Sequence, residues 1–203
     1  MLFSRGKYMK YIFKINLSLI FLSILWGVVQ INQMPESMPT HFGAQGLADG
    51  YSSKYFALLL LPLLSTLVLA LLTTSKQIIQ VSMAKVSLGV ISFLSLLHIC
   101  TIQQGISGTN LVGIVMPAGL SFLIGYLGWI LPTIEYNYAV GIRLPWTLSS
   151  ETNWKKTHQF AGKVFIAAGT VAFITSLFVS NVFVPLAALF IAGICCLVYS
   201  SKI

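Results

Sequence analysis

Three histidines and four carboxylates are the groups in this sequence that could carry acid–base chemistry or bind a metal. His41 and Asp49 share one polar stretch, whereas His98 lies inside an apolar run and His158 lies much further along the chain. Protein metal sites usually have three or four ligands at a recognisable spacing, and covalent catalysis pairs a nucleophile with a base. Because neither pattern is present, we predict no catalytic residues, no metal site and no cofactor. We expect hydrogen bonds of His41 and Asp49 to order their loop; a metal shared with His98 is the alternative that we do not favour.

The remaining reactive side chains lie inside apolar runs. Cys100, Cys195 and Cys196 are odd in number and none lies in a polar loop, which predicts buried free thiols rather than a disulfide. We expect His98 to be an interhelical hydrogen-bonding group, although ionisable residues inside membranes often have a functional role.

The composition requires a lipid environment. Hydrophobic residues make up 57% of the 203 residues and charged residues only 8%, against about 25% charged residues in soluble domains. A net charge of +8 would indicate a nucleic acid partner in a soluble protein. Here the charges gather at the ends of apolar segments, so we predict the lipid bilayer as partner and no direct contact with nucleic acid. Residues 1–203 are predicted to form a single membrane domain, because the loops are too short for a second core.

Six apolar segments are long enough to cross a membrane, since a helical span needs about 20 residues. They are residues 15–32, 55–73, 83–104, 111–131, 162–180 and 183–200. The basic start of the first segment is similar to that of a signal peptide, but residues 30–35 contain no small-residue cleavage pattern, so we interpret the segment as an uncleaved anchor. The predicted fold class is therefore all-α and polytopic.

Positive charges predict the orientation of these helices. When the N-terminus is placed in the cytoplasm, eleven of the twelve basic residues lie in cytoplasmic segments and only Lys54 lies outside, as the positive-inside rule requires. With six helices the C-terminus is then cytoplasmic as well. The eleven residues are Arg5, Lys7, Lys10, Lys14, Lys76, Lys85, Arg143, Lys155, Lys156, Lys163 and Lys202.

Two loops are long, residues 33–54 on the extracellular side and residues 132–161 on the cytoplasmic side. Each follows the first helix of a three-helix half, so the two halves have the same order of elements and opposite orientation. That order alone indicates a 3+3 inverted repeat. The sequences of the halves do not visibly match, and chance similarity is the preferred interpretation.

The extracellular loop is predicted to be a compact cap with fixed turns. Its prolines and glycines exclude a regular helix over most of its length. Pro39 restricts Met38 to extended geometry, and Asp49-Gly50 is a turn pair.

The second part of the cytoplasmic loop is predicted to begin a helix that runs along the membrane surface and bends into the fifth span near Gly162. Ser149 can cap this helix, and Glu151 in its first turn is favoured by the helix dipole. Trp146 and Trp154 are suited to anchor the segment at the membrane interface.

Residues 137–147, just before this helix, must satisfy their backbone polar groups through their own turns or against other parts of the protein. Arg143 in this stretch can bind Glu135, Glu151 or a lipid phosphate.

These two loops carry a family resemblance. The cytoplasmic loop resembles the signature of the SdpI family, which are bacterial immunity proteins that protect producing cells from a secreted peptide toxin. The extracellular loop resembles a short domain of unknown function found at the start of many members. The matching cytoplasmic residues are Asn137, Tyr138, Gly141, Ile142, Arg143, Pro145, Trp146, Thr147, Leu148, Glu151, Trp154, Lys155, Thr157 and His158, and the extracellular ones are Pro39, His41, Phe42, Gly46, Asp49, Ser53 and Lys54.

The resemblance implies a multi-pass protein of the bacterial plasma membrane that binds a secreted toxin through the extracellular residues, unless these residues only order the loop. In the best-known system of the family the membrane protein also holds a transcription repressor. A cytoplasmic repressor would meet the cytoplasmic residues here, and a purely structural role for those residues is the alternative.

Two other function classes compete with immunity. A small-solute or ion transporter is supported by the order of elements and opposed by spans that lack Asp and Glu. An enzyme is disfavoured because its only candidate acid–base groups are His41, Asp49 and His158, and His158 is predicted to lie across the membrane from the other two.

Overall fold

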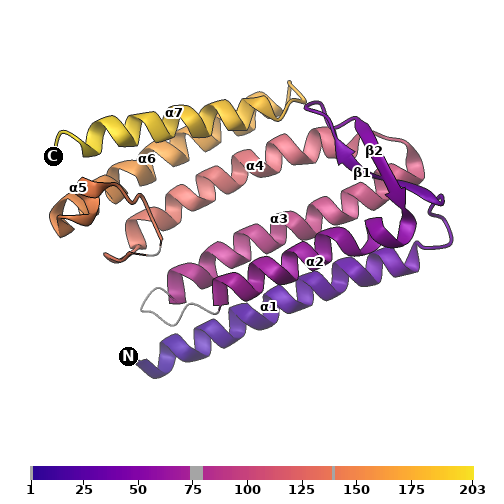
Figure 1. Cartoon of the computed structure of the whole chain (residues 1–203), viewed down its shortest axis with the longest axis horizontal. Helices are drawn as coiled ribbons and strands as arrows, with labels where there is room; N and C mark the ends of the chain where they lie inside the picture. The colour runs from indigo at the N-terminus through magenta and orange to yellow at the C-terminus, as the bar shows by residue number, and fades with distance from the viewer. Residues whose placement is uncertain (1, 74–79, 139) are drawn as a thin grey trace.

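Six long helices lie side by side in the computed structural model, which describes residues 2–73, 80–138 and 140–203 (Figure 1). All six are long and apolar enough to cross a membrane, so the predicted number of spans is confirmed for the described part of the chain. They are α1 (Leu2–Val29), α2 (Lys54–Thr73), α3 (Gln80–Ser107), α4 (Leu111–Ile130), α6 (Glu151–Ser176) and α7 (Phe183–Ser200). The shorter elements are the strands β1 (Ser37–Phe42) and β2 (Ala48–Ser53), the 3-10 turn η1 (Leu131–Thr133) and the one-turn helix α5 (Pro145–Leu148).

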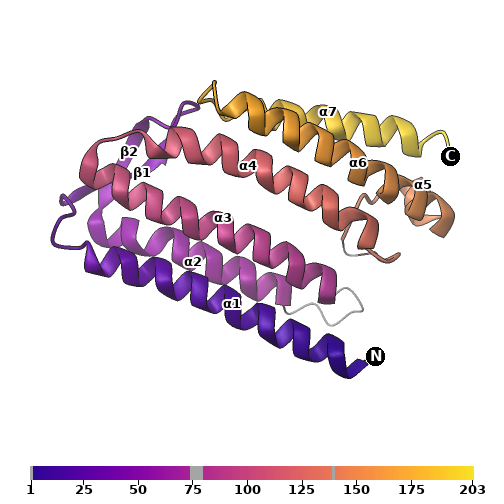
Figure 2. The ribbon, with the colours of Figure 1, turned by 180° about the vertical axis from the view of Figure 1, so that it is seen from behind.

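The helices form two groups of three, which join along α3 and α4 (Figures 1 and 2). In the first group α3 packs against both α1 and α2, and in the second group α6 packs against both α4 and α7. The central helix of the first group is α3, the third helix of the first half. The central helix of the second group is α6, which is the second helix of the second half. An inverted repeat would place the same helix in the middle of both halves, so the packing gives the repeat no support.

The connecting segments lie at the two ends of the bundle (Figure 1). We call one end the hairpin end: it contains β1, β2, the α3–α4 connection and the α6–α7 connection. The other is the motif end, where both chain termini and residues 134–138 and 140–150 are found. Residues that lie far apart in the sequence therefore meet at each end.

The extracellular loop of the prediction contains a two-stranded antiparallel sheet, so an all-α fold is wrong for this segment. β1 pairs with β2 from Ser37 opposite Ser53 to Phe42 opposite Ala48, with register shifts around His41. Only Met38 and Pro39 are buried in β1. β1 therefore lacks the alternation of apolar and polar residues by which a strand is recognised in a sequence.

α6 is one uninterrupted helix from Glu151 to Ser176, so the segment predicted to run along the membrane surface is continuous with the fifth span. Its N-cap is Ser150 rather than Ser149, because the Ser150 side chain accepts a hydrogen bond from the backbone N–H of Asn153. The helix continues through Gly162, where a Cβ would meet the ring of Pro132. Gly162 therefore allows a close contact between α6 and the η1 turn.

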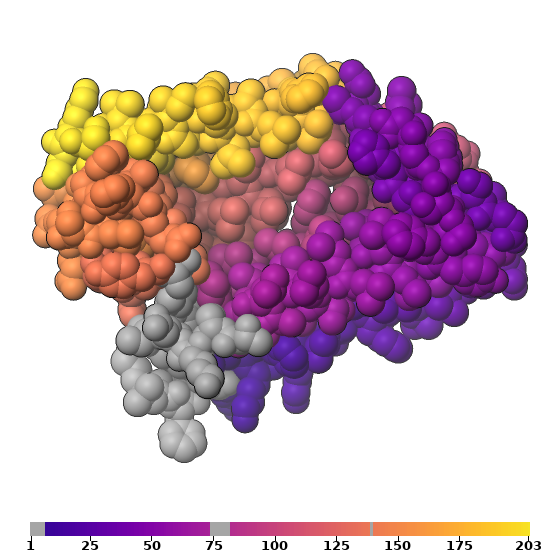
Figure 3. All heavy atoms as spheres, in the orientation of Figure 1, coloured from indigo at the N-terminus to yellow at the C-terminus, as the bar shows by residue number. Residues whose placement is uncertain are grey.

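Large apolar side chains cover the outside of the bundle. Leu63, Leu67, Phe122, Val171 and Phe190 are each more than half exposed, which suits contact with lipid and not with water. Figure 3 shows this surface hollowed between α2 and α7, with α3 and α4 at the bottom of the hollow.

α4 and α6 approach closely where Gly125 faces Gly169. A Cβ on Gly169 would lie 2.5 Å from the backbone nitrogen of Gly125 and 2.8 Å from the carbonyl oxygen of Ser121. A Cβ on Gly125 would meet nothing nearer than the Cα of Gly169 at 4.0 Å. The two glycines face each other, but only Gly169 has no room for a methyl group.

We predict that Gly169→Ala lowers the Tm of the detergent-purified protein, because the added methyl group forces α4 from α6 at a cost of about 1–3 kcal/mol. Gly125→Ala is the matched control. It has space for the methyl group and gains up to about 1 kcal/mol of helix propensity, so its Tm should be unchanged or higher. Equal losses in the two variants would contradict this account of the contact.

Candidate functional sites

At the hairpin end, β1 packs against α2 and α3, and β2 packs against α2 (Figure 1). Met34 and Met38 are buried against Ala57, Leu58 and Ile102. Methionine fills irregular gaps well because its side chain is unbranched. Apolar contact therefore fixes the hairpin on the ends of the helices.

The turn between the strands, residues 43–47, is bound to both groups of helices. Three successive carbonyl oxygens of this turn accept hydrogen bonds from α3, from the α3–α4 connection and from the α6–α7 connection, and we call this set of bonds the turn clasp. The bonds join Gly46 O to Gln104 Nε2 (3.0 Å), Gln45 O to Asn110 Nδ2 (3.0 Å) and Ala44 O to Val182 N (2.8 Å).

Gly46 is required by the geometry of this turn. Its φ of 72° lies in the left-handed region that favours glycine, and a Cβ here would overlap the backbone of Gly113 at the start of α4. The Gln104 side chain that binds Gly46 also accepts a hydrogen bond from the backbone N–H of Val112 at 2.8 Å. Gly46 and Gln104 thus hold the turn, α3 and α4 together.

The hairpin brings together His41 and Asp49, which were predicted to act as a pair. His41 Nδ1 is hydrogen-bonded to the Asp49 carboxylate, and the two side chains are 76% and 51% exposed. Within the described residues, no group of three or more His, Cys, Asp or Glu forms a metal-type cluster. The Lys54 ammonium forms an ion pair with Glu36 at 2.8 Å. Both pairs close the hairpin and leave polar groups accessible on its outer surface.

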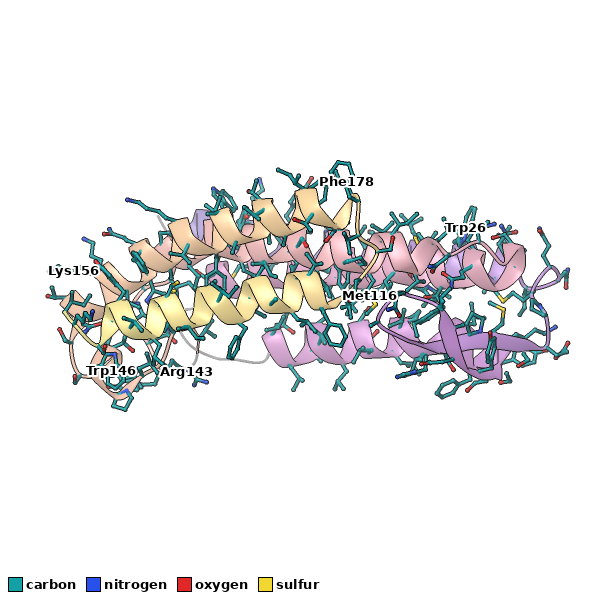
Figure 4. All side chains as sticks on the ribbon, turned by 90° about the horizontal axis from the view of Figure 1, so that it is seen from above. Trp26, Met116, Arg143, Trp146, Lys156 and Phe178 are labelled. Carbon is teal, nitrogen blue, oxygen red and sulfur yellow. The ribbon has the colours of Figure 1, made fainter. Side chains whose placement is uncertain are left out.

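Pro39 and Phe42, the other two predicted residues of the hairpin, face inward. Together with Thr40 they line a cavity of about 120 Å³ beneath β1. Residues of α2, α3 and α4 complete its wall, among them Met116, which Figure 4 labels near the hairpin.

At the motif end, Asn137 closes a tight turn. Its side-chain nitrogen donates to the carbonyls of Glu135 (2.7 Å) and Val140 (3.0 Å), and its side-chain oxygen accepts from the Val140 N–H (2.7 Å). Such bonds satisfy backbone groups that no helix or strand satisfies. This is a structural role for a residue of the predicted motif.

Trp154 and His158 form the packed centre of this segment. Their rings stack with centroids 4.1 Å apart, and Trp154 and His158 are 2% and 1% exposed. Trp154 Nε1 donates to the carbonyl of Ile134 at 3.0 Å. The prediction that Trp154 anchors the chain at the membrane interface is therefore wrong, because the ring is enclosed by protein.

His158 is bonded through both ring nitrogens. Its Nε2 accepts from the Ile142 N–H at 3.1 Å, so the proton is on Nδ1, which donates to the Trp154 carbonyl at 2.8 Å. Gly141 lies against this ring with a φ of 119°, and a Cβ there would overlap His158 Nε2. A neutral, fully bonded imidazole packed under Gly141 positions the backbone and is not free for acid–base chemistry.

Thr147 holds the next turn. Its hydroxyl donates to the Ile142 carbonyl at 2.8 Å and accepts from the Leu144 N–H at 2.8 Å. Pro145 begins α5, where its missing N–H leaves no bond unmade. Thr147 is completely buried, so these bonds are shielded from water.

Arg143 is exposed, and its Nη1 donates to the backbone carbonyl of Tyr138 at 3.0 Å. The partner of Arg143 that the structure shows is thus a backbone carbonyl, whereas the sequence suggested Glu135, Glu151 or a lipid phosphate. Tyr138 is 68% exposed, and the hydrogen bond between the Tyr136 and Tyr138 hydroxyls raises the pKa of Tyr136. Arg143 therefore closes a loop and keeps the rest of its guanidinium available at the surface.

Three side chains tie the motif end to the end of α7. Trp146 Nε1 donates to the Ser200 hydroxyl at 2.9 Å, and Asn153 Nδ2 donates to the Ser200 carbonyl at 2.9 Å. Thr157 donates in turn to the Asn153 side-chain oxygen at 2.9 Å. Trp146 is thus held by protein through its polar edge, as well as being placed at the end of the bundle (Figure 4).

The remaining motif residues are open to solvent. Glu151 lies in the first turn of α6, as predicted, and Lys155 is exposed one turn later beside Lys156. Figure 4 places Lys156 at the same end as Arg143. Together with Tyr138, these side chains form the part of the motif that a partner could contact.

Sequence reasoning missed Gln104, Asn110, Asn153 and Ser200 as positioning residues. Each is a polar residue at or near a helix end, and that location is the signal by which they could have been found. Their partners lie far away in the sequence, so their roles could not be assigned without the fold.

The fold and the two ends define a multi-pass helical membrane protein with an ordered irregular structure at each end of the bundle. Residues 133–200 match the SdpI/YfhL protein family, and residues 18–66 match a domain of unknown function, DUF1648. The first region contains most of the motif-end segment with α6 and α7. The second contains the hairpin with parts of α1 and α2.

The chain is also similar to the immunity protein SdpI of Bacillus subtilis (strain 168). The two are 25% identical over 170 residues, which cover 81% of each chain. No solved structure matches this chain.

We predict that Thr147→Val lowers the Tm of the purified protein. Valine keeps the shape of threonine, but the Ile142 carbonyl and the Leu144 N–H lose their partner, at a cost of about 1–3 kcal/mol. Thr147→Ser is the control, because it keeps the hydroxyl and should lose less. A valine variant as stable as the wild type would show that these bonds do not hold the segment.

Proposed function

We propose that this chain is an integral membrane immunity protein that protects the cell from a secreted peptide toxin by binding it. The observation that carries the proposal is the similarity to the immunity protein SdpI over 81% of both chains. A match of this extent includes most of the bundle rather than one shared pair of helices.

The proposed orientation places the hairpin end outside a bacterial cell and the motif end in its cytoplasm. Lys10, Lys155 and Lys202 are among the basic residues toward the motif end, whereas Lys54 begins α2 at the hairpin end. Lys76, which the sequence also assigns to the cytoplasmic side, lies outside the described residues. The distribution supports the orientation through the positive-inside rule.

The outer surface of the hairpin is the proposed toxin contact. Leu47 and Tyr51 are 61% and 59% exposed, and the His41–Asp49 pair is accessible in the same hairpin. Large apolar side chains beside polar groups are typical of peptide-binding surfaces. We therefore assign binding to the hairpin surface and positioning to its inward side.

A signal to a cytoplasmic repressor is the finer part of the proposal. A toxin bound outside changes an inside surface only if it prefers one of two helix arrangements. The turn clasp supports such a route, because it contacts both groups of helices. Tyr138, Lys155 and Lys156 would form the surface that meets the repressor.

A small-solute or ion transporter is the second candidate. The observation that favours it is the buried His98 in α3, since ionisable residues inside membranes often line transport paths. A transporter of this kind would give no toxin protection at normal expression, which separates the two functions.

The orientation is tested by thiol labelling. In a background that lacks Cys100, Cys195 and Cys196, we expect Ser37→Cys to react with a membrane-impermeant maleimide in intact cells, because this exposed residue begins β1. Ser149→Cys, equally exposed at the other end, should react only after lysis. Labelling of Ser149→Cys in intact cells would reverse the orientation.

Toxin binding is tested with His41→Ala in a sensitive bacterium challenged with toxin-containing supernatant of the source organism. Loss of an exposed pair costs only about 0.2–1 kcal/mol, so we expect near-normal expression but reduced survival. Lys202→Ala, exposed at the opposite end, is the control and should protect like the wild type. If the wild type itself gives no protection at normal expression, the immunity proposal fails.

A further inference from the structure

The first group of helices contains a row of buried polar side chains on α3. At one end of the row, Asn16 of α1 donates to Ser87 at 2.8 Å, while its side-chain oxygen has no partner within the described residues. At the other end, Gln104 binds the hairpin turn and α4. Between these ends, Ser95, His98 and Thr101 follow one another at intervals of three residues, which places them on one face of the helix.

These three residues have unmet hydrogen-bonding capacity. Ser95, His98 and Thr101 are 5%, 1% and 5% exposed. Within the described residues neither hydroxyl has a hydrogen-bond partner, and the His98 ring has at most one long bond, to the backbone of Leu58. The second group of helices differs. There the buried Ser121, which bonds to Ser176, and the buried His158 are satisfied by protein.

The surroundings of His98 exclude a charged ligand. A Cβ on Gly27 of α1 would meet His98 together with Leu58 of α2 and Ile102 of α3, so the groups around this part of the ring are apolar. A bound ion would need a counter-charge or several ligands. A neutral imidazole and two hydroxyls instead each offer a donor and an acceptor, which matches a small uncharged molecule that does both.

A route from outside ends at this row. Thr101 lines the cavity of about 120 Å³ that lies beneath β1. Thr40 of the hairpin contributes a second hydroxyl to the cavity wall. A water molecule needs about 10–15 Å³ of such volume, so the cavity has room for several, and Thr101 in its wall is about one turn of α3 from His98.

We propose that Ser95, His98 and Thr101 form an internal water-binding site within the membrane-spanning part of the first group, filled from the hairpin end through this cavity. Water donates to and accepts from each of the three side chains and so supplies the bonds that the protein does not. Below the hairpin, polar contacts of α3 with α1 and α2 are then made through water that exchanges with bulk solvent. In the second group the corresponding polar contacts are made directly between protein groups. This inference does not depend on the proposed immunity function.

Exchange of the histidine ring C2 hydrogen in deuterated buffer, followed by mass spectrometry of the full chain in lipid nanodiscs, tests the proposal. The chain has its own references: His41 is exposed, and His158 is buried with both nitrogens bonded. We expect His98 to exchange at least about tenfold faster than His158 over the full pH profile, because bound water exchanges with bulk solvent. Exchange as slow as that of His158 overturns the proposal.

A second measurement, the change in Tm caused by Thr101→Val, does not depend on histidine chemistry. If water binds the Thr101 hydroxyl, Thr101→Val removes a satisfied group and lowers the Tm. If the site is dry, the same change removes an unsatisfied hydroxyl and leaves the Tm unchanged or raises it. Thr147→Val, where protein satisfies the hydroxyl, is the control for a loss of Tm. An unchanged or higher Tm for Thr101→Val counts against the water site.

Discussion

A buried backbone N–H or carbonyl without a hydrogen-bond partner is costly, and this requirement shapes both ends of the bundle. The six helices satisfy their own backbones. At the hairpin end the two strands satisfy each other, and the carbonyls of Ala44, Gln45 and Gly46 are bonded to helix ends and connections. At the motif end there is little regular structure, and side chains form the hydrogen bonds to the backbone groups instead.

This requirement explains which residues the motif contains. Asn137, Thr147, Trp154 and His158 each bond to backbone atoms of the motif end, and Gly141 allows the chain to pass directly over the His158 ring. Their chemistry could be mistaken for that of a catalytic site. Their partners are backbone groups, so they build a surface on which Tyr138, Lys155 and Lys156 are presented.

The two groups of helices differ in how their interiors are held. In the second group, Gly125 and Gly169 bring α4 and α6 into close contact, and the hydroxyls of Ser121 and Ser176 lie 3.3 Å apart. In the first group, the buried hydroxyls of Ser95 and Thr101 on either side of His98 have no protein partner within the described residues. A cap that is bonded to both groups can respond to a bound peptide most easily by moving the group with fewer direct bonds. The proposed toxin contact and the proposed water site lie at that same end.

The sequence by itself determined the number of spans, the separation of basic residues and the position of the two irregular segments. These properties depend on local composition: about 20 apolar residues cross a bilayer wherever they occur, and prolines and glycines interrupt helices through their own covalent structure. Only the tertiary structure decided that residues 37–53 form a hairpin, that Trp154 is buried, and that α6 extends to Glu151. The same is true of the partners: Gln104 binds Gly46 across 58 residues of chain. No local pattern predicts such a bond, because its free energy depends on the simultaneous packing of segments that are neighbours only after the helices have assembled.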